Sequence, residues 1–383
     1  MFPNDPIHPL AAVTHRAPHD YYRRLAEGPP LRFDALLDCW LATGVAGVQT
    51  VLAHADCHVR PPGMAVPDNL LGTSCGAIFS ELVRMNDGVR HTAPKQVLAS
   101  ALGQVDLARL RQRTLQIARD RTPASAAHLN DVMFELPLFA MADLLGFAPE
   151  QWPQLAAWTR DFVACLSPLA NSGQLAGAQV AAAALLQRFT LLLRNPVPGS
   201  LLAEIKMAGW QNESGLLANL VGLLSQTCDA TAGLVGNAVL ALRTHAGLSG
   251  QLRADPALWP AMLREVSRHD PSIHNTRRYT AGAVEIGGVA LPPGQMILLV
   301  LASASHDAAV HVEPGNFVLQ RPVSPILTYG HGRHACPGQA LAQTMAAAGV
   351  QAWADALDTM PLAWSYQPSL NARIPLFMPG EAP

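Results

Sequence analysis

The chain has 383 residues, 50% of them hydrophobic, and a formal net charge of −2 at pH 7. This length and apolar content allow a sizeable core, in one large domain or two ordinary ones. The near-neutral charge gives no bulk electrostatic reason to expect nucleic acid or an anionic membrane as a partner.

The first ten residues contain prolines and an acid, so we expect neither a signal peptide nor a membrane anchor. Six cysteines are scattered without paired spacing, which disfavours a disulfide framework or a zinc knuckle and favours a cytoplasmic location. Prolines and glycines are spread along the chain without forming a linker. We therefore expect a single domain over residues 1–383.

The N-terminal part predicts a small β-region. Residues 39–43 read as a short strand, residues 48–54 as a short helix, and residues 61–63 as an irregular turn. Residues 64–85 are rich in turns and then weakly helical.

Helical patterns dominate residues 105–147, 149–166 and 176–194, and an Asn-Pro-Val-Pro-Gly run at 195–199 breaks them. We expect the loop at residues 167–177 to form the lid of a ligand pocket.

One segment predicts an unusually long helix. Residues 213–243 lack proline and keep an apolar helical pattern, which corresponds to roughly 45 Å at ~1.5 Å per residue. Near its centre, Gln226, Thr227, Ala230 and Leu234 lie on one helical stripe. Beyond it, a β-hairpin is expected, because two short apolar runs flank a Gly-Gly pair at 287–288.

Residues 329–338 present a single cysteine, Cys336, from a glycine-rich loop at the mouth of another long helix. Gly330 and Gly332 allow tight backbone approach and positive φ. Peptide N–H groups and the helix N-terminus favour negative charge on the sulfur. The loop suits a thiolate metal ligand, although a single cysteine taken alone is most often a buried free thiol.

This loop resembles that of the cytochrome P450 superfamily of haem-thiolate enzymes, with Tyr329 where Phe is usual and Pro337 where an aliphatic residue is more common. The resemblance covers essentially the whole chain. It implies a mainly α fold with small β-sheets, a triangular prism with a long central helix, and a β-rich part at about residues 1–60 and 270–300. Cys336 would ligate the iron of haem b.

The resemblance implies further haem contacts. His91 and Lys95, four residues apart on one helical face, would reach the propionates; Lys95 replaces the usual arginine, and the alternative is a solvated helix start. Pro94 is tolerable only in a first helical turn. Arg278 and His334 would also contact propionates. The implied cofactor-binding residues are His91, Lys95, Arg278, Tyr329, Gly330, His334 and Cys336.

On the long helix the resemblance implies a proton-delivery motif. Asp229 fits its acid, but Ala230 stands where a threonine is usual. Gln226, Thr227 or Thr231 could substitute, a substrate hydroxyl could complete the relay, or the chemistry needs none. Thr231 could instead bond the preceding turn of the helix.

Glu265 and Arg268, at i and i+3, could be a surface ion pair of little value. With Arg321 they resemble a Glu-Arg-Arg cluster, whose expected role is to fix the cysteine loop rather than to add net stability. The candidate substrate-pocket residues are Leu71, Phe79, Ala230, Ile273 and Asn275, with ordinary packing as the alternative for the first two.

The implied activity is insertion of one oxygen atom from O2 into a mostly apolar small molecule of secondary metabolism, such as a terpenoid, a fatty acyl or a polyketide-like compound. No flavin, nucleotide or iron–sulfur pattern is present, so electrons should come from a separate ferredoxin or flavodoxin with its reductase. Lys95, His331 and Arg333 are candidate contacts for that partner.

Three alternatives remain. Because Ala230 lacks the hydroxyl, the enzyme could catalyse peroxide-driven oxidation, desaturation, rearrangement or coupling. The protein could be a non-catalytic haem-binding sensor. A hydrolase with Cys336 as nucleophile and His334 as base is the third, but no orienting partner is identifiable.

Overall fold

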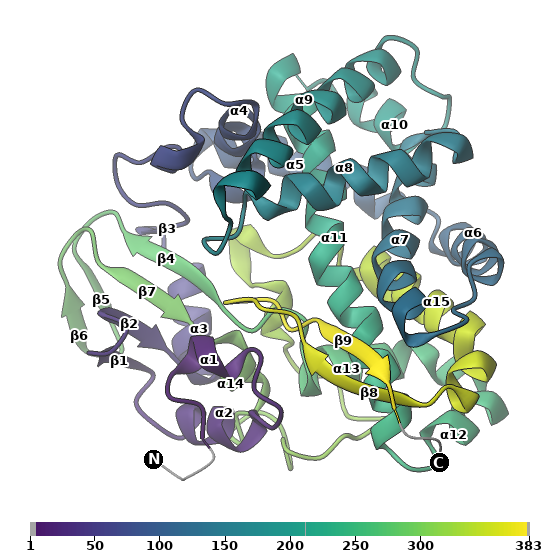
Figure 1. Ribbon diagram of the computed structural model, residues 1–383. Helices are drawn as coiled ribbons and strands as arrows, with labels where there is room; N and C mark the ends of the chain where they lie inside the picture. The colour runs from purple at the N-terminus through teal and green to yellow at the C-terminus, as the bar shows by residue number, and fades with distance from the viewer. Residues whose placement is uncertain (1–4, 211, 381–383) are drawn as a thin grey trace.

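The computed structural model describes residues 5–210 and 212–380. Figure 1 shows a large helical part at the top and right, and a smaller part at the lower left where the strands of the main sheet lie with the N-terminal helices. The predicted mainly α fold with small β-sheets is confirmed.

The main sheet joins segments that lie far apart in the sequence. Its strands are β1 (Leu31–Asp34), β2 (Cys39–Ala42), β3 (Cys57–His58), β4 (Thr276–Thr280) and β7 (Met296–Leu299). They follow the order β1-β2-β7-β4-β3, and only β2 and β7 are parallel neighbours. The parallel register pairs Trp40 with Ile297. The sheet therefore forms only when residues 31–58 and residues 276–299 come together.

Two other sheets are hairpins. The predicted hairpin is confirmed as β5 (Val284–Ile286) and β6 (Val289–Leu291), joined at Gly287 and Gly288, whose φ angles of +58° and +79° suit the tight turn. The second pairs β8 (Leu362–Tyr366) with β9 (Pro375–Pro379).

The N-terminal region is less β-rich than expected, because its first two elements are helices. It contains α1 (Pro9–Ala12), α2 (His19–Ala26) and α3 (Gly44–Ala53). The helix α3 begins four residues before the predicted start at residue 48, directly after strand β2.

The turn-rich stretch after β3 contains three short elements: η1 (Asp68–Leu70), α4 (Ser74–Glu81) and η2 (Val83–Met85). The next helix, α5 (Val89–Gly103), contains Pro94 in its interior rather than in its first turn. The expectation for Pro94 was therefore wrong, and its missing N–H removes one internal hydrogen bond from α5.

The central helices follow the predicted patterns, with sharper boundaries. They are α6 (Leu107–Asp120), α7 (Ala126–Leu145), η3 (Pro149–Gln151), α8 (Trp152–Ala164), α9 (Ser172–Arg194) and α10 (Leu201–Met207). The prediction of a lid loop over residues 167–177 was too long, because Asn171 and Gln174 form a capping box and α9 begins at Ser172. Helix α9 is the one described helix long and apolar enough to cross a membrane, yet a row of its side chains that includes Phe189 lies in the protein core.

The predicted long helix is confirmed as α11 (Glu213–Thr244), which runs through the middle of the helical part in Figure 1. The remaining helices are α12 (Leu248–Ala254), η4 (Pro256–Leu258), α13 (Trp259–His269), α14 (Leu301–Ser305), η5 (Leu327–Tyr329), η6 (Gly332–His334) and α15 (Gln339–Thr359). Helix α11 packs against α7, α15, α4 and α13 and is buried on most sides. A polar side chain near its centre therefore faces the interior of the molecule.

Candidate active site

The loop before α15 folds around Cys336. Gly330 and Gly332 have φ angles of +75° and +62°, and a Cβ atom on Gly330 would lie 3.2 Å from the carbonyl oxygen of His334. The Cys336 N–H donates to the carbonyl of Tyr329 at 2.7 Å. The two glycines thus make the positive-φ turns that the sequence predicted.

The sulfur of Cys336 lies at the start of α15. The backbone N–H groups of Gly338 and Gln339 donate to it and, with the nearby Lys95, lower the pKa of the thiol, whereas burial is the largest effect and raises it. Cys336 is nevertheless exposed. The sulfur is thus held by protein donors and is still open to a ligand.

Two buried nitrogen atoms near this loop have no hydrogen-bond partner among the described residues. They are Nε2 of His91 and Nε of Arg278. Burial lowers the pKa of His91 to about 4, with a further contribution from the charge of His334. Unpartnered buried donors are costly, so both groups suit an anionic ligand that supplies acceptors.

Two other predicted cofactor residues are held by the protein. The Nζ atom of Lys95 donates to the carbonyl of Ala335 at 2.6 Å. His334 Nε2 lies 3.0 Å from Oδ1 of Asp87, and the rings of His334 and His91 lie 4.1 Å apart. Lys95 therefore steadies the cysteine loop, and Asp87 orients His334.

Tyr329 links the loop to α13. Its hydroxyl oxygen lies 2.9 Å from the hydroxyl oxygen of Ser267. Burial raises the pKa of Tyr329 to about 12, although hydrogen bonds with Ser267 and Gln343 oppose the shift. The phenol is therefore a neutral hydrogen-bonding group beside the sulfur.

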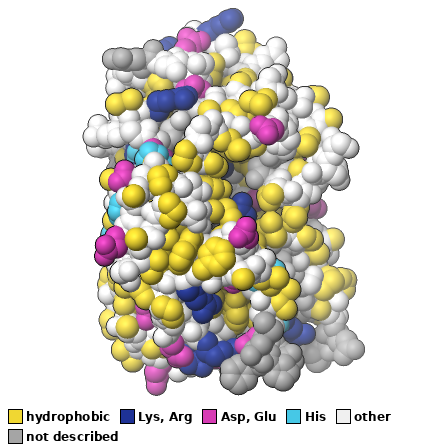
Figure 2. Space-filling view, turned by 90° about the vertical axis from the view of Figure 1, so that its left-hand side faces the viewer, with side chains coloured by type: hydrophobic (Ala, Val, Ile, Leu, Met, Phe, Trp, Pro, Cys, Tyr) yellow, Lys and Arg dark blue, Asp and Glu magenta, His cyan; other side chains and the backbone are white. Residues whose placement is uncertain are grey.

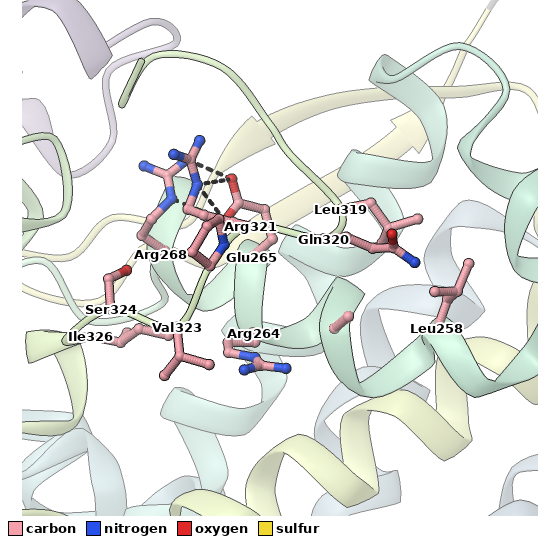
Figure 3. Close-up of a pocket in the computed structure, with 12 residues that line it drawn as sticks. Leu258, Arg264, Glu265, Arg268, Leu319, Gln320, Arg321, Val323, Ser324 and Ile326 are labelled. Carbon is pink, nitrogen blue, oxygen red and sulfur yellow. Dashed lines mark hydrogen bonds and ion pairs between the residues drawn. The ribbon is translucent and has the colours of Figure 1, made fainter. Parts of the chain in front are cut away.

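The predicted charged cluster is present. Glu265 makes two hydrogen bonds with Arg268, at 3.0 and 2.7 Å, and two with Arg321 Nε, both at 3.1 Å (Figure 3). Arg268 also donates to the carbonyls of Ser305, Pro314 and Asn316. The ion pairs are almost fully buried, so the surface-pair alternative was wrong. A cavity of about 290 Å³ lies beside this cluster. Apart from the three residues of the cluster, Arg264 is the one charged residue among the described residues that line it.

The candidate relay residues lie along α11. Gln226 is exposed, and its Nε2 donates to the carbonyl of Gly222 at 2.8 Å; Thr227 is buried and donates to the carbonyl of Leu223 at 2.7 Å. Thr227 thus makes the hydrogen bond to the preceding helical turn that was an alternative for Thr231.

Asp229 and Ala230 are half-buried, and Thr231 is buried. Burial raises the pKa of Asp229, opposed by a hydrogen bond with the Cys228 thiol and by the charges of Arg160 and Arg84. An acid tuned in this way can hold a proton more readily than a surface carboxyl.

The predicted pocket residues differ in how free they are. The ring of Phe79 lies under the guanidinium of Arg60, 5.2 Å from its centre, and Asn275 donates to the carbonyl of Leu370 at 2.7 Å. Ile273 packs against the core and bridges to Ala372. The side chains of Phe79 and Asn275 are thus engaged within the protein.

Leu71 is 60% exposed and belongs to the segment before α4. Figure 2 shows the molecular face on that side, where hydrophobic side chains gather in the middle, above a group of Lys and Arg side chains.

Of the three candidate basic contacts for a redox partner, two are engaged within the protein. Arg333 donates to the carbonyls of His54, Ala55 and Cys57, and Lys95 bonds Ala335. Only His331 is exposed. The contact of Lys95, His331 and Arg333 with a redox partner stays a prediction, and the hydrogen bonds show that Arg333 and Lys95 also hold the protein's own backbone.

Sequence reasoning missed Asp87, Arg160 and Arg84. Asp87 accepts hydrogen bonds from His334 and from the N–H of Val59; these lower its pKa despite the opposing effect of burial, which is the largest. No local pattern marks these residues, because each acts on a group far away in the sequence.

Comparisons with known proteins agree with this geometry. The profile of the family described as Cytochrome P450 matches residues 203–351. Cytochrome P450 107B1 of Saccharopolyspora erythraea is 27% identical over 361 residues, which cover 85% of this chain and 84% of that protein. The cytochrome P450 monooxygenase PikC of Streptomyces venezuelae is 27% identical, over 92% of this chain and 89% of that protein. The solved structure of CalO2 has the same fold, with a TM-score of 0.83 at 24% identity over 98% of this chain and 99% of that one.

The fold and the site thus define an oxidoreductase that takes a haem-iron cofactor. The chain belongs to the cytochrome P450 superfamily, within a set of bacterial monooxygenases that includes enzymes of secondary metabolism. Bacterial members generally use redox partner proteins and small-molecule substrates. The family, fold class and enzyme class predicted from the sequence are confirmed.

Proposed function

We propose that Cys336 supplies the thiolate ligand of haem b and that His91 and Arg278 bind its propionates. The observation that supports this most directly is the exposed sulfur held by two N–H groups, in a region that also contains two unpartnered buried donors. When bound, haem with a thiolate ligand supplies the oxygen-activating chemistry and favours O–O cleavage. Lys95 and Tyr329 keep the cysteine loop in position, and Asp87 orients His334.

We further propose that the enzyme inserts one oxygen atom into a largely apolar small molecule, with Asp229 holding the proton that the reaction consumes. Gln226, Thr227 and Thr231 are the candidates to pass that proton, and Ala230 and Ile273 to line the pocket. Electrons come from a separate ferredoxin or flavodoxin with its reductase, and the protein works in the cytoplasm. Residues 1–383 form one domain, because β2 and β7 lie far apart in the chain and pair directly.

The test is the absorption spectrum of the reduced, carbon-monoxide-treated protein. We expect a thiolate-type band in the unmodified protein and in Cys39→Ala, a control at a buried cysteine of strand β2. Cys336→Ser should lose that band. A histidine-type spectrum of the unmodified protein, or an unchanged spectrum of Cys336→Ser, contradicts the proposal.

A second candidate function is an atypical outcome such as peroxide-driven oxidation, desaturation, rearrangement or coupling. It is favoured by Ala230, because a half-buried methyl group stands where a hydroxyl would pass protons. The ratio of product formed to reductant consumed, compared with turnover on peroxide alone, separates the two.

A further inference from the structure

Arg84 lies in the short helix η2, between α4 and α5. This segment is fixed against α11. The N–H of Val83 donates to Oδ1 of Asn219 at 2.9 Å, and Leu82 packs so closely on Gly222 that a Cβ atom there would meet Leu82 Cδ2 at 2.8 Å. The backbone of Arg84 is therefore held at the wall of α11, on the N-terminal side of Gln226.

The side chain of Arg84 is exposed, and nearby protein groups still shift the pKa of its guanidinium. Arg84 is exposed, yet burial lowers the pKa of its guanidinium and the charge of Asp229 raises it. Cys336 combines the same two properties, and Gln226 is exposed on a helix that is otherwise mostly buried. All three groups are therefore open to a ligand, and the influence of the Asp229 charge places Arg84 near the candidate relay.

The guanidinium of Arg84 has unused hydrogen-bonding capacity. Among residues 5–210 and 212–380, no hydrogen bond or ion pair joins it to a protein group, whereas the neighbouring Arg90 forms an ion pair with Glu81 at 2.9 Å. Asp229 does not neutralise it fully, because that carboxyl also bonds the Cys228 thiol and lies near Arg160. An arginine carries five N–H donors, so an exposed guanidinium without a protein partner is free to bind an anionic group.

We propose that Arg84 binds a carboxylate group of the substrate. The planar guanidinium matches a carboxylate with two parallel hydrogen bonds, a geometry that a lysine cannot reproduce. The substrate class then narrows from apolar molecules in general to apolar molecules with one acidic end, such as fatty or arylalkanoic acids. This inference rests on the proposed function, because it assumes that the substrate binds between Cys336 and the helix α11.

The experiment is calorimetric titration of the purified holoenzyme with matched pairs of a carboxylic acid and the corresponding alcohol. The pairs are octanoic acid and octanol, dodecanoic acid and dodecanol, and phenylacetic acid and phenylethanol. We expect at least one acid to bind about tenfold more tightly than its alcohol, as a charge-assisted hydrogen bond predicts. Arg84→Gln should weaken the acid to the level of the alcohol and leave the alcohol within about twofold; Arg84→Lys should retain part of the preference.

The matched control is Arg90→Gln, which removes an arginine of the same segment whose charge Glu81 already neutralises. It should bind acids and alcohols as the unmodified protein does. The proposal is wrong if no acid binds more tightly than its alcohol, or if Arg84→Gln weakens both equally. The thiolate-type band of the carbon-monoxide complex is recorded for each variant, so that failure of this inference is distinguishable from failure of the cysteine-ligand proposal.

Discussion

The Asp229 carboxyl has three neighbours that favour its charged form, and burial opposes them. Burial is the largest influence and raises its pKa, whereas the Cys228 thiol and the charges of Arg160 and Arg84 lower it. Asp131 lies near the same arginine, with its Oδ1 3.8 Å from Arg160 Nη1, but it is 61% exposed on α7. The two acids therefore share a cation and differ in whether they face the interior.

Asp229→Asn should slow turnover by about 100-fold, as expected when a positioned proton donor is removed, and should leave haem content intact. Asp131→Asn is the control, since it removes a carboxyl from Arg160 without changing α11. The measurement is kcat under steady-state reduction, with haem absorbance per protein recorded in parallel. Unchanged turnover of Asp229→Asn would remove this acid from the proton relay.

Local patterns were enough to predict the glycine turns and to single out Cys336 and Asp229 as candidates, because their signals lie within a few consecutive residues. Arg84 and Asp87 could not be found in this way. Arg84 matters because η2 is fixed on α11 by Asn219, more than a hundred residues away, and Asp87 because it meets His334. Such contacts arise only when the chain folds, so local sequence patterns could not reveal these two residues.

At the scale of elements, local patterns predicted which helices exist better than where those helices begin and end. The helix α11 was predicted nearly to the residue because a long apolar pattern without proline leaves few alternatives. The start of α9 was missed because Asn171 and Gln174, which read as loop residues, form its capping box. Pro94 was misplaced because α5 begins at Val89, more than one turn before the proline.

The Glu265 cluster joins α13 to the segment at residues 318–321, since Glu265 accepts from Arg268 on its own helix, from Arg321 and from the N–H of Val318. Despite burial, which is the largest effect and opposes it, these donors lower the pKa of Glu265. Glu265→Gln would leave two buried cations without a carboxylate, so we expect the free energy of unfolding to fall by about 3–5 kcal/mol.

Urea unfolding and haem retention on a desalting column are the measurements for Glu265→Gln. The control is Glu285→Gln, at an exposed position of β5, which should change neither. A stability loss no larger than that of the control would mean that the cluster does not support the cysteine loop.

At the scale of the whole molecule, the two ends of the chain meet at Asp270. Its Oδ1 lies 2.7 Å from Nε of Arg373 and 3.5 Å from Nε2 of His19, and Arg373 also donates to the carbonyls of Val13 and His15. Four histidine rings pack beside this carboxyl in a chain of contacts with centroid distances from 4.6 to 5.8 Å: His19, His245, His269 and His306.

These histidines make stability depend on pH. Burial, reinforced by the charge of His19, lowers the pKa of His269 to about 4, whereas an unfolded histidine titrates near its ordinary value. Between about pH 6.5 and pH 4 the unfolded chain therefore binds the proton that folded His269 refuses. The stability is present above this window and is lost as the pH falls through it, by about 1.4 kcal/mol per pH unit for each such group.

His269→Gln should remove one such group and make the decline of the free energy of unfolding between pH 6.5 and pH 5 shallower by about 1.4 kcal/mol per unit. The side chain of glutamine can still donate to the Gly315 carbonyl, which lies 3.0 Å from His269 Nε2, so the fold should persist. Urea unfolding at several pH values measures the slope, and His331→Gln, at an exposed position, is the control. An equal slope in the unmodified protein and in His269→Gln would show that this ring already accepts its proton in the folded chain, and the acid sensitivity would then have to come from groups other than the ones that join the chain ends.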